Sequence, residues 1–255
     1  MVDGCLPTYP EIPQKHKTLE FYNQYIYTME GTTPIHSAAQ NGSISEVSAL
    51  LTEDPLRINS VDSDGRTPLH WACTMNNFPM IQMMLPFVKK DLDDMVDESG
   101  WTPVHIVCAV GNNEALGLFM AKEPIPDINL ATGQGTTALH LAVSKGHVEV
   151  VKLILESYKG KVNVRDKRGL SALHRAAAAG NNALVRLLVA KKAAINATDK
   201  EGWTPLHHAW AEGHDGTGMI LLELGADDRV EDLEGQTAGM VAIDEEIRKK
   251  YLGRK

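Results

Sequence analysis

One ten-residue phrase recurs six times along this chain, and its histidines are separated by 34, 35, 35, 34 and 33 residues. The copies are TPIHSAAQNG, TPLHWACTMN, TPVHIVCAVG, TALHLAVSKG, SALHRAAAAG and TPLHHAWAEG. A repeat of this length and regularity indicates a stack of similar units, none of which is large enough to bury its own apolar face. Because such a stack presents an extended surface, the repeat constrains both the fold and the kind of function.

Each phrase carries the signals of a short helix. In the second copy, Thr67 is suited to the N-cap and Pro68 to the first helical position, where its missing N–H costs nothing. Six residues after each motif histidine stands a glycine, or Asn76 in the second copy, which predicts a left-handed residue that ends the helix. A second apolar segment with helical spacing follows, and then a polar turn that usually has a D-x-x-G core. Each unit is therefore predicted to be a helix, an antiparallel second helix and a hairpin tip.

This pattern resembles the ankyrin repeat. The resemblance covers residues 28–255 and implies an all-α fold, an ankyrin-repeat solenoid of about seven helix-turn-helix and β-hairpin units. The last unit lacks the motif proline and histidine, and its helix is expected to continue through DEEIRKKY as a polar C-terminal capping repeat. Residues 1–27 lack the pattern and are expected to be a flexible N-terminal extension or a short added cap. Met29 is a candidate start codon, which an intact-mass measurement of the native protein would test.

Composition narrows the class of partner and the compartment. The 255-residue chain is 43% apolar and 23% charged, and its net charge of −8 argues against DNA or an anionic membrane as the main partner. It has no run of about 18 uncharged apolar residues, and its N-terminus does not read as a secretory signal. Three cysteines without CxxC spacing fit a reducing compartment, so the cytoplasm and nucleus are expected. The basic C-terminal tail is interpreted as a solvated helix end, with a nuclear signal as the alternative.

The histidines and cysteines raise the question of a metal or catalytic site. Cys73 and Cys108 stand where other repeats have Ala, Val or Trp, so they are interpreted as helix core. His207 is a motif histidine, expected to join its helix to a hairpin by hydrogen bonds. Only His208 is unexplained by the repeat, and one residue makes no metal site. The chain is therefore predicted not to be an enzyme and to need no cofactor or metal.

Specificity in a repeat protein is expected at the positions that vary between units. Trp71 lies on a first helix, and Trp101 and Trp203 lie on hairpin fingers. Tryptophan is frequent at interface hot spots, but at these positions it can equally cover the neighbouring finger. The sequence leaves these two interpretations open.

Charge is unevenly distributed along the repeats. Residues 91–98, DLDDMVDE, are acidic, whereas residues 159–168 are rich in Lys and Arg, with Arg175 behind them. Such a pattern predicts a partner with the reverse order of charge, which sets register and orientation more than affinity. The alternative is that both stretches are simply solvated.

The phrases DGRTPLHWAC, DESGWTPVHIVCAVGN, LHRAAAAGN and DKEGWTPLHHAWAEGH are together similar to the gankyrin family, and most similar to its fungal members. These proteins are ankyrin-repeat assembly chaperones of the proteasome regulatory particle. The resemblance implies a concave face that binds the C-terminal domain of the third AAA ATPase subunit of the base, assists base assembly and delays docking on the core particle. By position it implies basic contacts at Arg66 and Arg165. It implies acidic contacts at Asp62, Asp64, Asp97 and Glu98.

The predicted partner-binding residues combine these charged positions with the variable aromatic ones. They are Asp62, Asp64, Arg66, Trp71, Asp97, Glu98, Trp101, Arg165, Lys167, Arg168, Arg175, Trp203 and His208. The chain is expected to be a monomer outside its complex. The competing hypothesis is an ankyrin-repeat adaptor for a ubiquitin-ligase or transcriptional complex, which predicts no affinity for proteasomal ATPases.

Overall fold

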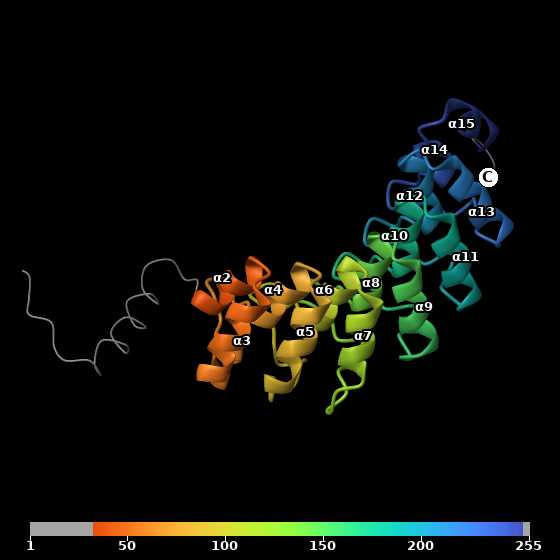
Figure 1. Ribbon diagram of the computed structural model, residues 1–255. Coiled ribbons are helices and arrows are strands. Elements are labelled where there is room, and N and C mark those ends of the chain that lie inside the picture. The colour runs from red at the N-terminus through yellow and green to blue at the C-terminus, as the bar shows by residue number, and fades with distance from the viewer. Residues whose placement is uncertain (1–32, 252–255) are drawn as a thin grey trace, which may run out of the picture.

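The computed structural model describes residues 33–251, which form one curved row of helix pairs (Figure 1). The expectations for residues 1–27 and for Met29 lie outside the described residues. The inner row consists of α2 (Pro34–Gln40), α4 (Pro68–Thr74), α6 (Pro103–Val110), α8 (Ala138–Ser144), α10 (Ala172–Ala178), α12 (Pro205–Ala211) and α14 (Ala238–Val241). The outer row consists of α3 (Ile44–Glu53), α5 (Phe78–Met84), α7 (Asn113–Met120), α9 (Val148–Glu156), α11 (Asn182–Ala190), α13 (Asp215–Glu223) and α15 (Glu245–Tyr251). Two 3-10 turns, η1 (Pro55–Asn59) and η2 (Leu85–Phe87), follow α3 and α5. The predicted all-α ankyrin solenoid is confirmed.

The motif histidine both starts its own helix and holds the next repeat. In α4 the Nδ1 atom of His70 accepts a hydrogen bond from the backbone N–H of Thr67 at 3.1 Å. That contact leaves the proton on Nε2, which donates to the carbonyl oxygen of Trp101 in the following finger at 3.2 Å. Capping boxes of this kind begin α4, α6, α8, α10 and α12. The predicted link between helix and hairpin is thus confirmed, and it crosses from one repeat to the next.

The predicted helix stops are also found. The glycine six residues after the motif histidine has a positive φ in each case, for example 84° at Gly111, and Asn76 takes its place with φ 53°. A side chain at Gly111 would collide with His147, since a Cβ there would lie 2.6 Å from Nδ1 of that ring. Left-handed backbone and lack of space together require glycine at this turn.

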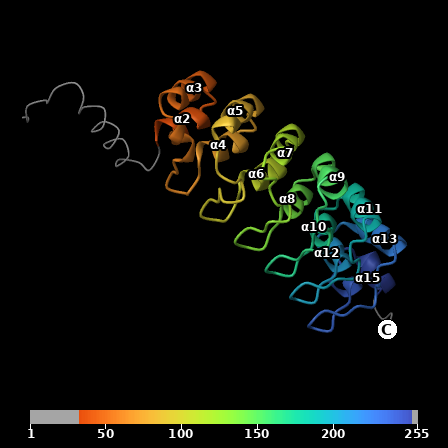
Figure 2. The ribbon, with the colours of Figure 1, turned by 90° about the horizontal axis from the view of Figure 1, so that it is seen from below.

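The fingers form a second continuous row along one side of the helices (Figure 2). Each finger tip is joined to the previous one by a backbone hydrogen bond, as from Lys167 N to Gln134 O at 2.9 Å and from Lys200 N to Arg168 O at 3.0 Å. Three isolated antiparallel bridges, such as Arg165 with Ser171, are the β-structure among residues 33–251. The tips are therefore held in register and form a preorganised surface.

The core lies between the two helical rows. Small residues of the inner helices, including Ala72, Ala142 and Ala176, are fully buried and allow the outer helices to approach closely. Cys73 and Cys108 are free thiols in this core, which confirms their interpretation as packing residues. Burial raises the pKa of both thiols far above the usual range, so they stay protonated.

The capping repeat differs from the expected single helix. α14 ends at Val241, and Ala242 has an extended ψ of 136°, so the chain breaks before α15 begins at Glu245. The carboxylate of Asp244 accepts hydrogen bonds from the N–H groups of Glu246 and Ile247 at 2.8 and 2.9 Å. An aspartate that caps a new helix start is favoured over one inside a helix, which explains why the expected continuous helix is wrong.

Candidate binding surface

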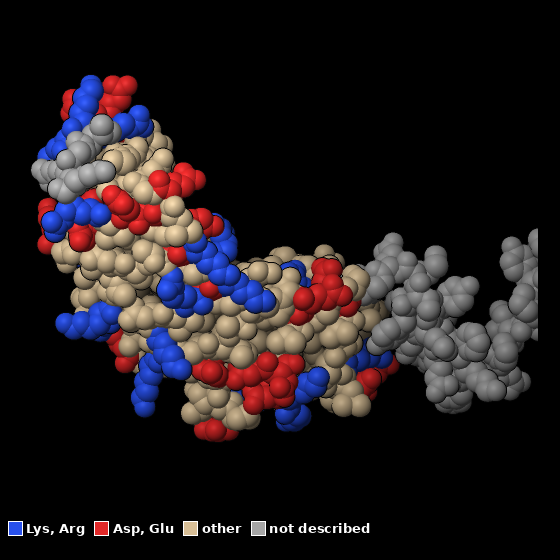
Figure 3. Space-filling model, turned by 180° about the vertical axis from the view of Figure 1, so that it is seen from behind, with Lys and Arg blue, Asp and Glu red and all other residues tan. Residues whose placement is uncertain are grey.

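The row of repeats is nearly straight from α2 to α8 and then bends, so that the inner helices and fingers line a concave side (Figure 1). Viewed from the finger side, Lys and Arg gather near the bend, and separate groups of Asp and Glu lie on the N-terminal arm (Figure 3). We call the surface formed by the finger tips and the exposed side of the inner helices the concave face. Nearly all the predicted binding residues belong to its elements.

The first aspartate of each D-x-x-G turn holds its own finger. One carboxylate oxygen, Oδ1, accepts hydrogen bonds from the backbone N–H groups two and four residues later, as Asp62 does from Asp64 and Arg66 at 3.0 and 2.9 Å. Asp97, Asp166, Asp199 and Asp232 repeat this geometry. These carboxylates are therefore part of the scaffold.

The second oxygen, Oδ2, binds a side chain nine residues later where that side chain is a donor. Asp62 accepts from Trp71 Nε1 at 2.7 Å, Asp166 pairs with Arg175 at 2.7 Å, and His208 lies 2.8 Å from Asp199. In the sequence, Trp71, Arg175 and His208 stand at positions that vary between repeats and were predicted to contact a partner. The constant nine-residue spacing from the turn aspartate is the signal in the sequence that indicates their internal contacts.

Where the ninth residue is apolar, the donor comes from the preceding finger. Ile106 stands nine residues after Asp97, and Arg66 Nε approaches that carboxylate at 3.4 Å instead. Trp203 Nε1 donates in the same way to Asp232 at 3.0 Å, across one finger. The variable residues thus decide whether the turn carboxylate links within a repeat or between repeats.

This network occupies the carboxylate oxygens of two residues that were predicted as acidic contacts, Asp62 and Asp97. The side chain of Asp97 is only 4% exposed, and both of its oxygens are used inside the protein, so it is not an exposed acidic contact. Asp62 is half-buried and likewise accepts from its own finger and from Trp71. Burial raises the pKa of Asp62, the hydrogen bonds to Trp71 and the backbone lower it, and the net pKa lies below the usual value. Asp64 and Glu98 are exposed at the finger tips.

The predicted basic residues are divided between free and internally paired groups. Arg165, Lys167 and Arg168 are exposed on one finger, and Arg165 Nε donates to Gly169 O at 2.9 Å. Arg175 is held by Asp166, and its other terminal nitrogen donates to Ser144 Oγ at 3.2 Å. Arg66 is half-buried between Asp97 and the ring of Trp71, whose centroid is 5.1 Å from its guanidinium carbon.

The three tryptophans of this surface differ in their contacts. Trp203 covers the neighbouring finger by its hydrogen bond to Asp232 and packs edge-on against His208, with ring centroids 5.2 Å apart. Trp71 is tied to Asp62. The half-buried Trp101 makes no side-chain hydrogen bond with the residues described here, so its indole N–H is available. The covering interpretation is therefore confirmed for Trp203, and a role of Trp101 as an interface anchor stays a prediction.

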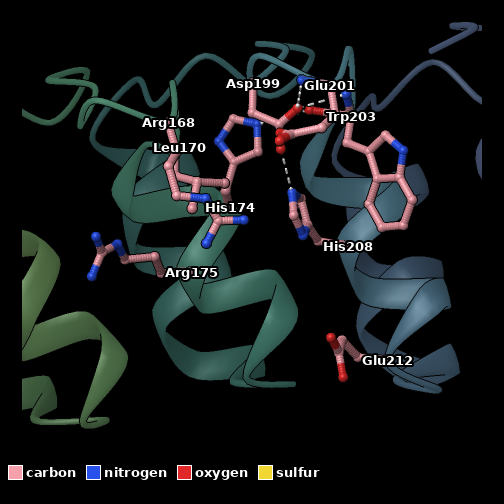
Figure 4. Close-up of a pocket in the computed structure, with 9 residues that line it drawn as sticks. All are labelled: Arg168, Leu170, His174, Arg175, Asp199, Glu201, Trp203, His208 and Glu212. Atoms are coloured by element: carbon pink, nitrogen blue, oxygen red, sulfur yellow. Dashed lines mark hydrogen bonds and ion pairs between the residues drawn. The ribbon is translucent and has the colours of Figure 1, made fainter. Parts of the chain in front are cut away.

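A pocket of about 410 Å³ opens between the fingers at 166–169 and 199–202 (Figure 4). Arg168 and Leu170 lie on one side of it, Glu201 and Trp203 on the other, and His208 points upward to Asp199 (Figure 4). The remaining lining residues are His174, Arg175 and Glu212. The pocket joins two repeats on the concave face.

Residues 33–251 contain no group of three or more His, Cys, Asp or Glu side chains arranged to hold a metal ion. Over the same residues, no helix has the length and apolar character that crossing a bilayer requires.

Comparison with known proteins identifies the family. A model described as ankyrin repeats (3 copies) matches residues 14–94, 86–166 and 158–232. The "Probable 26S proteasome regulatory subunit p28" of Saccharomyces cerevisiae is 40% identical over 86% of this chain and 97% of its own length. The chain belongs to the gankyrin family of ankyrin-repeat proteins.

Other relatives of this gankyrin-family chain share its repeats more loosely. The "Ankyrin repeat-containing protein C6C3.08" of Schizosaccharomyces pombe is 37% identical over 48% of the chain, which spans 53% of that relative. The crystal structure of the ankyrin repeat domain of Bcl-3 superposes with a TM-score of 0.70 and 26% identity, over 87% of this chain and 98% of the other. The structural match supports the solenoid architecture over 87% of the chain.

Proposed function

We propose that this chain is a non-catalytic protein-binding chaperone of the proteasome regulatory particle. Its concave face binds the C-terminal domain of the third ATPase subunit of the base, assists base assembly and delays docking on the core particle. This function requires no catalytic step. While the preformed concave face covers the partner, it blocks another contact of that partner, until assembly displaces the chaperone.

One observation carries the proposal. The similarity to the yeast protein named "Probable 26S proteasome regulatory subunit p28" extends over nearly the full length of that protein, so it is not limited to the generic repeat phrases. A shared proteasomal partner is the simplest reason for two repeat arrays to keep the same length and 40% of their residues. The expected place of action is the cytoplasm and nucleus.

The free charges of the concave face support a charged partner. Arg165 and Lys167 are exposed on one finger, and Asp64 and Glu98 on two others. Complementary charges in the opposite order on the ATPase domain would orient it along the row of fingers. Interfaces of this kind bury at least about 800 Å² on each partner.

The test is co-purification with the C-terminal domain of the third ATPase subunit. Replacing Arg165→Glu together with Lys167→Glu is expected to weaken binding about tenfold or more, because two exposed attractions become repulsions. Arg66→Glu is less suitable, since it places a carboxylate next to the buried Asp97 and would disturb the fold.

The matched control carries the same charge change on the outer row. Arg186→Glu with Lys192→Glu changes two exposed residues of α11 and its end, and should leave binding unchanged. If wild-type protein binds no proteasomal ATPase but co-purifies with a ubiquitin-ligase or transcriptional complex, the adaptor hypothesis replaces this one.

A further inference from the structure

Successive fingers are joined tip to tip along the row shown in Figure 2, and the first described finger has a free donor at its N-terminal side. The N–H of Glu98, one residue after its turn aspartate, donates to the carbonyl oxygen of Asp64 in the preceding finger at 3.0 Å. The same contact is made by the N–H groups of Gly133, Lys167, Lys200 and Leu233. Ser63 holds this position in the first described finger, and its N–H has no hydrogen-bond partner among residues 33–251. The row can therefore accept one more finger at this end.

The sequence just before α2 repeats that of a described finger. Residues 28–36, TMEGTTPIH, match residues 132–140, TGQGTTALH, at five of nine positions. In the described finger, Thr132 replaces the usual turn aspartate, and its Oγ1 accepts from the backbone N–H groups two and four residues later at 3.4 and 3.3 Å. Thr28 stands at the same place in the earlier copy, so this fold already contains a finger of the kind that its sequence predicts.

The glycine of each finger shows how closely the next finger approaches. At Gly135 φ is 76°, and a Cβ there would lie 3.0 Å from the backbone nitrogen of Lys167 in the next finger. At Gly235, in the last described finger, a Cβ would meet nothing within 4 Å. Gly31 occupies this position in the copy before Ser63. The sequence therefore has glycine where a finger seated on Ser63 requires it.

We propose that residues 28–33 form one further finger at the N-terminal end of the row, in which the carbonyl oxygen of Glu30 accepts the hydrogen bond from Ser63. The side chain of Glu30 then stands at the tip position that Asp64 holds in the next finger. With the exposed Asp64 and Glu98, it makes three successive acidic tips, which fit a basic segment of a protein partner. This last part rests on the proposed function, because it extends the concave face that would bind the ATPase domain.

Hydrogen exchange of the Ser63 amide, followed by ¹H–¹⁵N spectra of the full chain, tests the finger. Thr28→Ala removes the turn acceptor and should speed this exchange about fivefold or more. Thr28→Asp supplies the stronger acceptor that most fingers use, and should slow the exchange. Thr8→Ala and Thr8→Asp are the matched controls outside the finger. The amide of Asp64, which is bonded within its own finger, is the internal reference.

A second variant tests the close approach of the two fingers. Gly31→Ala places a Cβ against the backbone of Ser63 and strains a left-handed residue, so it should also speed the exchange at Ser63. Gly4→Ala is its control, since it makes the same change outside residues 28–33.

Charge reversal tests the acidic tip. Glu30→Lys should weaken co-purification with the C-terminal domain of the third ATPase subunit about threefold or more, because an attraction becomes a repulsion. Glu11→Lys makes the same charge change before the finger and should leave binding unchanged.

Equal exchange at Ser63 in wild type, Thr28→Ala and Thr28→Asp would overturn the finger. A native protein that begins at Met29 would do so too, because it lacks Thr28. Binding of Glu30→Lys as tight as that of wild type would overturn the acidic tip. The exchange measurement needs no ATPase, so a wild-type chain that fails to co-purify counts against the proposed function, while the exchange at Ser63 still decides the finger.

Discussion

The motif histidine is the residue that joins consecutive repeats. In α8, His140 accepts from the N–H of Thr137 at 3.2 Å and donates to the carbonyl of Leu170 in the next repeat at 3.1 Å. Both bonds require the neutral ring with its proton on Nε2. Protonation of Nδ1 would break the contact with the helix start, so pH acts directly on the link between repeats.

Burial is the main cause that lowers the pKa of His140 to about 4, and the charge of Arg175 adds to it. In the unfolded chain the pKa is about 6.5. The stabilisation is therefore complete above pH 6.5 and is lost as the pH falls toward 4, because the unfolded state binds the proton first. The free energy of unfolding, measured with urea, is therefore expected to be much lower at pH 5.0 than at pH 7.5.

His140→Ala supplies the comparison. The variant should be less stable than wild type at pH 7.5, but it should lose about 2 kcal/mol less than wild type between pH 7.5 and 5.0. Equal losses for the two proteins would show that protonation of His140 does not contribute.

The turn aspartates are expected to contribute to stability, whereas acidic residues at the exposed finger tips are not. Asp97→Ala removes the acceptor for Ser99, Trp101 and Arg66, and should lower the free energy of unfolding by about 1–3 kcal/mol. Asp64→Ala, on the exposed tip of the preceding finger, should change it by less than about 0.5 kcal/mol. Urea unfolding of both variants measures the difference, and comparable losses would contradict the division.

At the scale of elements, each helix pair depends on small residues where two helices meet. α13 contains two helical glycines with opposite surroundings. A Cβ at Gly218 would lie 2.0 Å from Nε1 of Trp210 in α12, whereas a Cβ at Gly216 would meet nothing within 4 Å. Trp210 is fully buried, so it has no space into which it can move.

Alanine at these two positions should therefore change the stability of the protein in opposite directions. Gly218→Ala is expected to destabilise the protein by about 1–3 kcal/mol through overpacking against Trp210. Gly216→Ala should stabilise it by about 0.5–1 kcal/mol, because alanine loses less backbone freedom in a helix. Thermal unfolding followed by circular dichroism distinguishes them, and a shift of the same sign in both would refute the packing argument.

At the scale of the whole molecule, stability adds up from neighbouring repeats, and the last one must be closed. α15 closes it by laying Tyr251 against Trp210, with ring centroids 4.8 Å apart. The outward residues of this helix, Glu245 to Lys250, are mostly exposed, which suits a cap.

A chain ending at residue 243 is expected to lose this closure. Its free energy of unfolding should fall by about 2 kcal/mol or more, which lowers the midpoint of the unfolding transition. The tryptophan fluorescence should also change, because Trp210 becomes exposed to water. A chain ending at residue 251 keeps the contact and serves as the control. Identical midpoints for the two would show that α15 does not act as a cap.

The amino-acid sequence alone predicts the repeat, the helix starts and stops, the burial of Cys73 and Cys108, and the resemblance to the family. These features depend on contacts between residues close together in the chain or on a recurring pattern. Both can be recognised in the sequence. It also predicted that the motif histidine joins helix and hairpin.

Which of the variable residues are free depends on contacts between repeats, and these are seen in the folded chain. Asp97 and Trp203 have the residue types of interface contacts, but neighbouring repeats bring Arg66 and Asp232 within hydrogen-bond distance of them. The pocket, too, exists only because two fingers and two helices meet across a repeat boundary. Side chains from different repeats can bind the same hydrogen-bond donor or acceptor. Which of them does so depends on distances in the folded chain, and the sequence does not specify these distances.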